Sequence, residues 1–290
     1  MSASFPKHAQ VVVIGGGIHG CSVAYHLAKN GWKDVVLVER KKLTSGTTWH
    51  AAGLVGQLQG THATTAFASY GVELLQEIEA ETGLSPGFRQ NGSISIAVNQ
   101  SRLSELKRKA DFARLFGVEA SFIATDAIAE RWPLMNAEGV LGGIYMPSDG
   151  SANPTDLTQA LARGARMNGA QIFENIKVET VLTSGGKVTG VETDAGIISA
   201  EFVVNCAGMW ARDLGLRNNV DIPLYAVEHF YALTESLDDV YPDMPTFRDP
   251  DGLIYGREEV GGLLVGCFDR DALPVRLSDL PAPFEFALLN

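Results

Sequence analysis

The chain has 290 residues, of which 46% are hydrophobic and 20% charged, and its formal net charge at pH 7 is −11. This composition is typical of a folded, water-soluble protein of about two domains and excludes a largely disordered chain. The acidic balance argues against a nucleic-acid-binding protein, and no apolar run approaches the ~20 residues of a membrane-spanning helix.

Cysteine and histidine usage gives no sign of a disulfide-rich or metal-binding protein. The three cysteines, Cys21, Cys206 and Cys267, are too few and too far apart for a disulfide framework, and no Cys and His residues cluster as metal ligands do. The N-terminal segment lacks the apolar stretch of a secretory signal. We therefore expect a cytoplasmic protein without a metal site.

The first predicted unit, from Gln10 to Glu39, is a strand, a glycine-rich turn, a helix and a second strand. Apolar runs over 11–14 and 35–38 predict two buried strands, and apolar residues at helical spacing predict a helix over 18–30. A strand followed by such a turn and a helix is the setting in which glycines bind a dinucleotide.

The turn itself has the spacing G-x-G-x-x-G, at Gly15, Gly17 and Gly20. Gly15 permits the tight turn, Gly17 lets a pyrophosphate approach the backbone, and Gly20 lets the helix pack closely against the strand. The helix N-terminus then offers N–H groups to the phosphates. Glu39 follows the last glycine by 19 residues (39 − 20), close to the roughly 20 at which an acidic residue binds a ribose hydroxyl. His19, between the glycines, is expected to be exposed and to have no role.

A polar segment and a series of alternating elements follow. Ser45, Thr47 and Thr48 supply hydroxyl groups around a glycine, and a short helix is expected to start at 49–52. Further helices are predicted over 64–81, 101–116, 125–131, 154–167 and 210–216. Strands are predicted over 92–98, 142–146, 171–174, 178–183, 187–192, 196–200, 203–205, 227–234, 252–255 and 263–268, with 171–200 forming a β-meander and 252–268 a hairpin.

This alternation predicts an α/β protein of two domains, each of which receives the chain twice. The dinucleotide-binding domain is expected to comprise residues 1–85 and 147–220. A largely β substrate domain is expected to comprise residues 86–146 and 221–290.

Five segments of the chain resemble one known family. They are VVVIGGGIHG at 11–20, TTWHAAG at 47–53, QNGSISIA at 90–97, VVNCAGMWA at 203–211 and RDPDGLIYGRE at 248–258. Together they resemble the FAD-dependent sarcosine and dimethylglycine dehydrogenases, flavoproteins similar to D-amino-acid oxidase, and TTWHAAG is the most specific of them. The resemblance extends over essentially the whole chain. It implies a Rossmann-like FAD-binding domain of the GR2 type, interleaved with a mainly antiparallel β substrate domain.

The resemblance also implies which residues contact the cofactor and the substrate. His50 is expected to carry FAD covalently through the flavin 8α-methyl group. Catalytic roles are implied for His229, which accepts a proton, and Tyr255, which positions a substrate carboxylate, with Arg248 and Arg257 as nearby cations. The full cofactor-binding set expected from the turn and the resemblance is Gly15, Gly17, Gly20, Glu39, Arg40, Ser45, Thr47, Thr48, His50, Val178, Ala207 and Gly208. A purely structural role is the alternative for His50, His229 and Tyr255.

The reaction that the resemblance implies is FAD-dependent oxidation of an N-methylated amino acid such as sarcosine or dimethylglycine. The methyl carbon loses hydride to the flavin, and the iminium product yields formaldehyde or passes its one-carbon unit to tetrahydrofolate. The electrons go to an electron-transfer flavoprotein or to oxygen. Two flavoprotein alternatives stay open: a related amine or amino-acid oxidase that uses oxygen, and a truncated FAD-binding module without catalysis. A nicotinamide-dependent dehydrogenase fits the segment up to Glu39 but leaves TTWHAAG unexplained.

Members of the resembled family continue beyond the length of this chain. They close the FAD domain with a later strand and a glycine-rich turn at the flavin ring, and often add a folate-binding C-terminal region. The sequence ends at PFEFALLN, so we expect a fragment of a longer polypeptide. Tetrahydrofolate is expected to bind only in the missing C-terminal region.

Overall fold

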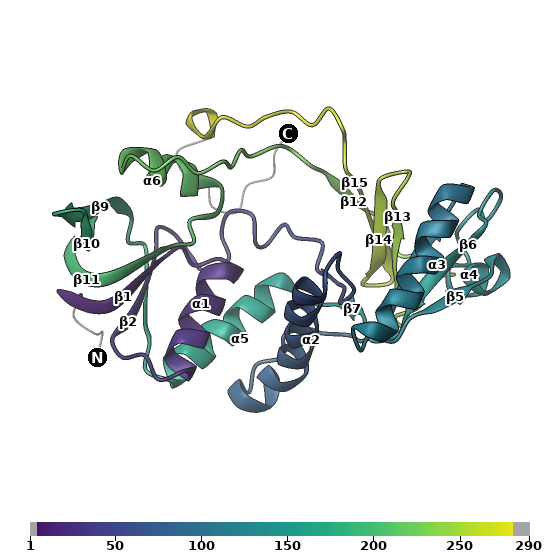
Figure 1. The fold of residues 1–290 in the computed structure, drawn as a ribbon, viewed down its shortest axis with the longest axis horizontal. Coiled ribbons are helices and arrows are strands. Elements are labelled where there is room, and N and C mark those ends of the chain that lie inside the picture. The colour runs from purple at the N-terminus through teal and green to yellow at the C-terminus, as the bar shows by residue number, and fades with distance from the viewer. Residues whose placement is uncertain (1–4, 281–290) are drawn as a thin grey trace.

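The structure, a computed structural model, describes residues 5–280 and contains two units, each built around one β-sheet (Figure 1). The two sheets lie at opposite ends of an elongated molecule. Three helices, α1 (Ile18–Lys29), α2 (His62–Thr82) and α5 (Pro154–Met167), lie between them. Both sheets take strands from two separate stretches of the chain. The domain boundaries expected from the sequence stay a prediction.

The first sheet has six strands in the order β8-β2-β1-β11-β10-β9. Its strands are β1 (His8–Ile14), β2 (Val35–Glu39), β8 (Gln171–Glu174), β9 (Val178–Ser184), β10 (Lys187–Thr193) and β11 (Gly196–Asn205). The four strands from β8 to β11 in this order are parallel, and β10 and β9 continue the sheet antiparallel to β11. Parallel strands need crossover connections, which α1 and α5 supply.

The predicted meander is confirmed only for β9, β10 and β11. β8 instead pairs in parallel with β2 at the far edge, because α5 carries the chain across the sheet before β8 begins. The strands predicted at 196–200 and 203–205 are one strand, since β11 pairs with β1 in a single register from Ser199 to Asn205.

Both faces of the first sheet are covered by helices. α1 and α5 cover one face and pack against each other, with Tyr25 fully buried between them. A Cβ on Gly164 would lie 2.7 Å from the Tyr25 ring, so this glycine lets the two helices approach closely. On the other face, Leu214 of α6 (Ala211–Arg217) packs against Val12 and its buried neighbours.

The second sheet has seven strands in the order β12-β15-β14-β13-β4-β6-β5. Its strands are β4 (Ser93–Ala97), β5 (Ser121–Ile123), β6 (Gly142–Met146), β12 (Tyr231–Leu233), β13 (Thr246–Asp249), β14 (Ile254–Glu259) and β15 (Gly262–Cys267). Every neighbouring pair is antiparallel except β13 with β4, which confirms the expected mainly antiparallel sheet. α3 (Gln100–Leu115) packs on one face and α4 (Thr125–Arg131) on the other.

Three local predictions differ from the structure. Residues 49–50 form a turn and 51–52 are irregular rather than helical, because Gly53 has a positive φ of 71° and the chain then pairs as β3 (Leu54–Val55) with β7 (Gly150–Ser151). The strand predicted at 227–234 is reduced to β12. A 3₁₀ turn at Gly208–Trp210 precedes α6. Within residues 5–280 no helix is both long enough and apolar enough to span a membrane.

Candidate functional site

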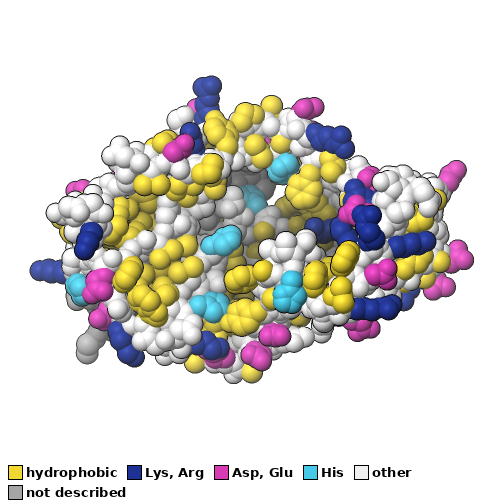
Figure 2. Space-filling model, in the orientation of Figure 1, with side chains coloured by type: hydrophobic (Ala, Val, Ile, Leu, Met, Phe, Trp, Pro, Cys, Tyr) yellow, Lys and Arg dark blue, Asp and Glu magenta, His cyan; other side chains and the backbone are white. Residues whose placement is uncertain are grey.

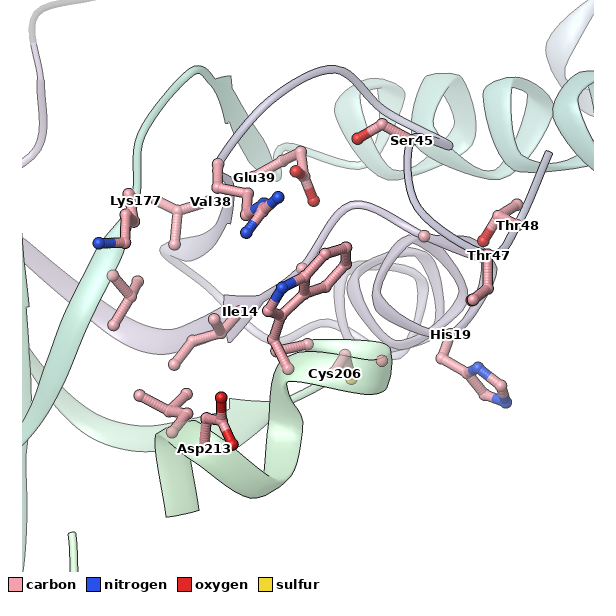
Figure 3. A pocket seen from close by; sticks show the side chains of 18 of the residues that line it. Ile14, His19, Val38, Glu39, Ser45, Thr47, Thr48, Lys177, Cys206 and Asp213 are labelled. Atoms are coloured by element: carbon pink, nitrogen blue, oxygen red, sulfur yellow. The ribbon is translucent and has the colours of Figure 1, made fainter. Parts of the chain in front are cut away.

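A pocket lies at the carboxyl ends of parallel strands β1, β2 and β11, where nucleotides bind in open α/β sheets (Figure 3). It encloses about 950 Å³ of empty space, including its open mouth. The glycine turn, the start of α1, the segment after β2 and the turn after β11 form its walls. We call it the turn pocket.

The three glycines of the turn stand where no side chain fits. A Cβ on Gly15, whose φ is +107°, would lie 2.3 Å from the carbonyl oxygen of Cys206, the residue that follows β11. A Cβ on Gly20 would lie 1.8 Å from the carbonyl oxygen of Gly15, and one on Gly17 would lie 2.8 Å from Thr48 Oγ1. The turn therefore presents bare backbone to the pocket, as close approach of a pyrophosphate requires.

Glu39 ends β2 with its carboxylate against the turn. Its Oε2 accepts the N–H of Gly16 at 2.6 Å, and its Oε1 accepts the N–H of Lys41 at 2.8 Å. The side chain is buried, and burial raises the pKa of this carboxyl, while the two backbone N–H groups act in the opposite direction. Each oxygen keeps a further lone pair. The carboxylate can therefore hold the turn and still accept a ribose hydroxyl.

The remaining walls suit an adenosine group. The apolar side chains of Val178, Ile176 and Leu214 line one side of the pocket. Opposite them, the Arg40 guanidinium lies 3.9 Å from the ring centroid of Trp210. A bare glycine turn, a carboxylate with further lone pairs and an apolar slot together fit the AMP half of a dinucleotide.

Ten of the expected cofactor-binding residues line this one pocket: Gly15, Gly17, Glu39, Arg40, Ser45, Thr47, Thr48, Val178, Ala207 and Gly208. Gly20 lies behind the turn in contact with Gly15, as its packing role requires. Trp210, Lys177 and Asp213 also line the pocket and were missed. These residues follow the carboxyl ends of β11 and β8, and this position in the sequence could have identified them as pocket residues. His19 is exposed, as expected, but lies at the pocket wall (Figure 3).

A second pocket, of about 1230 Å³ with its mouth, lies between the segment 54–59 and one face of the second sheet. We call it the sheet pocket. The molecular surface is hollowed between the two units, and histidine side chains surround the hollow (Figure 2). Arg248 and Tyr255 line the sheet pocket, and so does Asp149, which sequence reasoning missed.

Asp149 forms a buried acidic floor in the sheet pocket. Only 1% of it is exposed, and its carboxylate accepts Ser93 Oγ at 2.6 Å and the Gln57 N–H at 2.9 Å. Burial raises the pKa of this carboxyl, and the hydrogen bonds and the charge of Arg248 lower it. No carboxylate of the described chain forms an ion pair with Arg248, which is exposed to the pocket. Arg248 is therefore the cation that a bound carboxylate would meet.

Strand register places Tyr255 beside Arg248 on one face of the sheet. Arg248 pairs with Tyr255, and Tyr255 pairs with Gly266, which pairs with Tyr231. A Cβ on Gly266 would lie 2.2 Å from Tyr255 Cζ, so the tyrosine ring lies across the strand at that glycine. Burial raises the pKa of the Tyr255 hydroxyl, with Tyr231 acting in the same direction, so it stays protonated near neutral pH and can donate.

The structure brings His229 and Tyr255 together through a shared aromatic neighbour. The ring centroid of Phe268 lies 5.4 Å from that of His229 and 5.2 Å from that of Tyr255. His229 is exposed and does not itself line the sheet pocket. His50 lies apart from both pockets, half-buried, with its ring 3.8 Å from that of Trp49.

We expect Gly266→Ala to displace the Tyr255 ring, because the added Cβ meets the end of that side chain. The cost should be roughly 1–3 kcal/mol of unfolding free energy, the range for overpacking. In a Tyr255→Ala background the same change should cost less than about 0.5 kcal/mol, because the clash is gone. Urea unfolding of the four proteins measures this coupling. Equal costs in both backgrounds would contradict the placement of the ring.

Comparisons with known proteins agree with this architecture. The sequence pattern of a family described as FAD dependent oxidoreductase matches residues 10–286. The chain is 42% identical over 277 residues to 4-methylaminobutanoate oxidase (formaldehyde-forming) of Paenarthrobacter nicotinovorans, covering 96% of this chain and 34% of that protein. It is also 42% identical to the mitochondrial pyruvate dehydrogenase phosphatase regulatory subunit of Mus musculus, and the match covers 94% of this chain and 32% of that protein. It is 40% identical to human mitochondrial sarcosine dehydrogenase, covering 100% and 32%.

The chain therefore spans about a third of the length of these relatives. Among solved structures, L-proline dehydrogenase from P. horikoshii superposes with a TM-score of 0.83 at 28% identity, covering 90% of this chain and 70% of that one. The expected family resemblance and the expected fold class are both confirmed.

Proposed function

The chain belongs to the family of FAD-dependent oxidoreductases, and from that premise we propose that it binds FAD at the turn pocket and oxidises an N-methylated amino acid. The observation that carries the proposal is the turn pocket, where ten residues expected from the sequence meet. Bound FAD supplies the hydride acceptor that no side chain can provide. Relatives named for sarcosine and 4-methylaminobutanoate support the substrate class.

The residues of the turn pocket divide the cofactor between them. The backbone of the glycine turn and the first turn of α1 face the pyrophosphate. Glu39 accepts a ribose hydroxyl, and Val178 flanks the adenine with Ala207 and Gly208. Ser45 and Thr47 line the same pocket and offer hydroxyl groups to the cofactor.

The sheet pocket is the proposed substrate site. Arg248 binds the substrate carboxylate and Tyr255 donates its hydroxyl to the same group. The amine must lose its proton before it can be oxidised. His229, beside Phe268 at the edge of this pocket, is the proposed proton acceptor.

We also propose that His50 carries the flavin covalently. His50 would supply a neutral ring nitrogen as the nucleophile toward the 8α position of bound FAD. Support comes from the TTWHAAG segment, whose Ala52 carbonyl accepts a hydrogen bond from Arg257 of the second unit. The electron acceptor during turnover, whether electron-transfer flavoprotein or oxygen, stays a prediction, as do tetrahydrofolate binding and a cytoplasmic location.

One experiment tests the cofactor and the reaction together. The whole natural polypeptide is purified, precipitated with acid and examined for flavin fluorescence in pellet and supernatant. A fluorescent pellet that is lost in His50→Ala supports attachment, and free flavin in the supernatant refutes it. Turnover is then measured with sarcosine, dimethylglycine and 4-methylaminobutanoate, with oxygen or an artificial electron acceptor.

A second candidate is an FAD-binding protein with a regulatory role. This candidate is supported by the 42% identity to a phosphatase regulatory subunit, a relative whose name refers to regulation and not to a redox reaction. Tight FAD binding without oxidation of any of the three amines would support this candidate against the enzyme.

Arg248→Gln is expected to lower kcat/KM for these amino acids roughly 30-fold, since a lost charge-assisted bond to a carboxylate corresponds to about 2 kcal/mol. The loss should appear mainly in KM. Arg102→Gln is the control, because Arg102 does not itself line the sheet pocket and is paired with Asp251 and Glu105. A normal KM in Arg248→Gln would rule out Arg248 as the carboxylate-binding residue.

A further inference from the structure

Arg257 in β14 reaches from the second unit to the segment that carries His50. Only 12% of its side chain is exposed. Its Nε donates to the carbonyl of Ala52 at 2.6 Å, its Nη1 donates to the carbonyl of Glu258 at 2.9 Å, and its Nη2 forms an ion pair with Glu259. All three nitrogens of this guanidinium have protein partners. Arg257 is therefore committed to holding the chain rather than to binding a substrate carboxylate.

The stretch 51–53 is held in place by contacts from elsewhere in the fold. It forms neither helix nor strand. Gly53 has a positive φ, and its carbonyl accepts the N–H of Ala152 at 2.8 Å. The preceding carbonyl is the one that Arg257 holds. Two successive peptide groups within three residues of His50 are thus fixed by distant parts of the chain.

A neighbouring pair ties β14 to the same region a second time. Glu258, which is 3% exposed, forms an ion pair with Arg89. The backbone of Arg89 exchanges hydrogen bonds with Ser151 at 2.8 and 3.0 Å, and Ser151 pairs with Leu54. β14, which carries Arg257, is therefore connected through Glu258 and Arg89 to β7 and β3, and β3 directly follows the His50 segment.

We propose that Arg257 is a positioning residue for flavin attachment: by holding the Ala52 carbonyl it fixes the direction in which His50 leaves the backbone. This inference rests on the proposed covalent role of His50. Bond formation with a bound ligand requires the reacting atoms to be held about 3–3.5 Å apart, and a displacement of 1 Å can cost roughly 100-fold in rate. A charged donor to a partly buried carbonyl is a strong restraint of that kind. Attachment then depends on the second unit being folded against the first.

The test uses the whole natural polypeptide, prepared without flavin, in wild-type form and as Arg257→Gln, Arg257→Lys and Arg102→Gln. Arg102→Gln is the control because it removes a partly buried arginine with two carboxylate partners and no contact to residues 50–55. FAD is added, and the fraction of flavin that stays with acid-denatured protein is followed with time. Amide hydrogen exchange over residues 51–55 is measured in the same proteins before FAD is added.

Arg257→Gln should slow attachment roughly 10- to 100-fold and speed exchange over 51–55, with neither change in Arg102→Gln and partial recovery in Arg257→Lys. Wild-type rates of attachment and exchange in Arg257→Gln would overturn the inference. If wild-type protein retains no flavin after denaturation, the proposed role of His50 fails and the attachment role of Arg257 fails with it. The exchange data then report separately whether Arg257 restrains the segment.

Discussion

Gly20→Ala will weaken FAD binding at least roughly 100-fold, which corresponds to about 3 kcal/mol. The added Cβ would lie 1.8 Å from the carbonyl oxygen of Gly15, and a backbone atom cannot swing aside as a side-chain end can. Either α1 moves off the sheet or the turn rearranges. Both changes alter the backbone that faces the pyrophosphate. Titration of flavin-free protein with FAD, followed by flavin fluorescence, measures the loss.

Gly71→Ala is the matched control for that experiment. Gly71 lies within α2, its φ is not positive, and no atom lies within 4 Å of an added Cβ. Alanine should therefore leave FAD affinity unchanged and stabilise the fold by up to about 1 kcal/mol. Unchanged FAD affinity in Gly20→Ala would show that the turn tolerates a side chain there, and equal losses in both variants would show that the loss is not specific to the turn.

Glu39→Ala is expected to destabilise the protein by roughly 2–5 kcal/mol and to weaken FAD binding together with it. The change leaves the buried N–H groups of Gly16 and Lys41 without their acceptor, at about 1–3 kcal/mol each, and removes the proposed ribose acceptor. Denaturant unfolding of the flavin-free protein measures the first effect. Glu77→Ala, on the exposed side of α2, is the control and should change stability by less than about 0.5 kcal/mol. An unchanged midpoint in Glu39→Ala would contradict the role of this carboxylate in holding the turn.

The shifted pKa of Glu39 predicts the direction in which the stability of the protein changes with pH. Burial raises the folded-state pKa of Glu39 above the unfolded value of 4.5, so the folded state binds a proton more readily than the unfolded state. Its contribution to stability is therefore largest below pH 4.5 and is lost as the pH rises through the folded pKa. The stability of Glu39→Gln relative to wild type should rise over this window and then level off.

The turn pocket could be predicted because its chemistry is encoded locally. One strand–turn–helix–strand unit contains Gly15, Gly17, Gly20 and Glu39. The spacing of these residues predicts both the geometry of the turn and a dinucleotide ligand. The largely β second unit followed from alternating patterns and turn residues, and its mainly antiparallel pairing was expected from the family resemblance.

Other features depend on contacts that local patterns do not record. β8 could not be placed beside β2 from its own sequence, because strand order follows from the crossover of α5. Asp149 reads as a loop residue, yet its partners Ser93 and Gln57 are 56 and 92 residues away. Arg257 was expected to be a cation near the substrate, but its guanidinium donates to the carbonyl of Ala52, which is 205 residues away in the sequence.

The pairing of β1 with β11 has a consequence for synthesis of the protein. His8 lies opposite Ser199, so β1 cannot gain this neighbour until nearly two hundred residues have left the ribosome. During that interval β1 presents an unpaired apolar edge, and the second sheet is interrupted as well, since β4 awaits β13. Contacts of such high sequence separation slow folding and expose the nascent chain to misassembly. The first sheet is therefore complete only when the chain has reached Asn205, and the second only when it has reached Cys267.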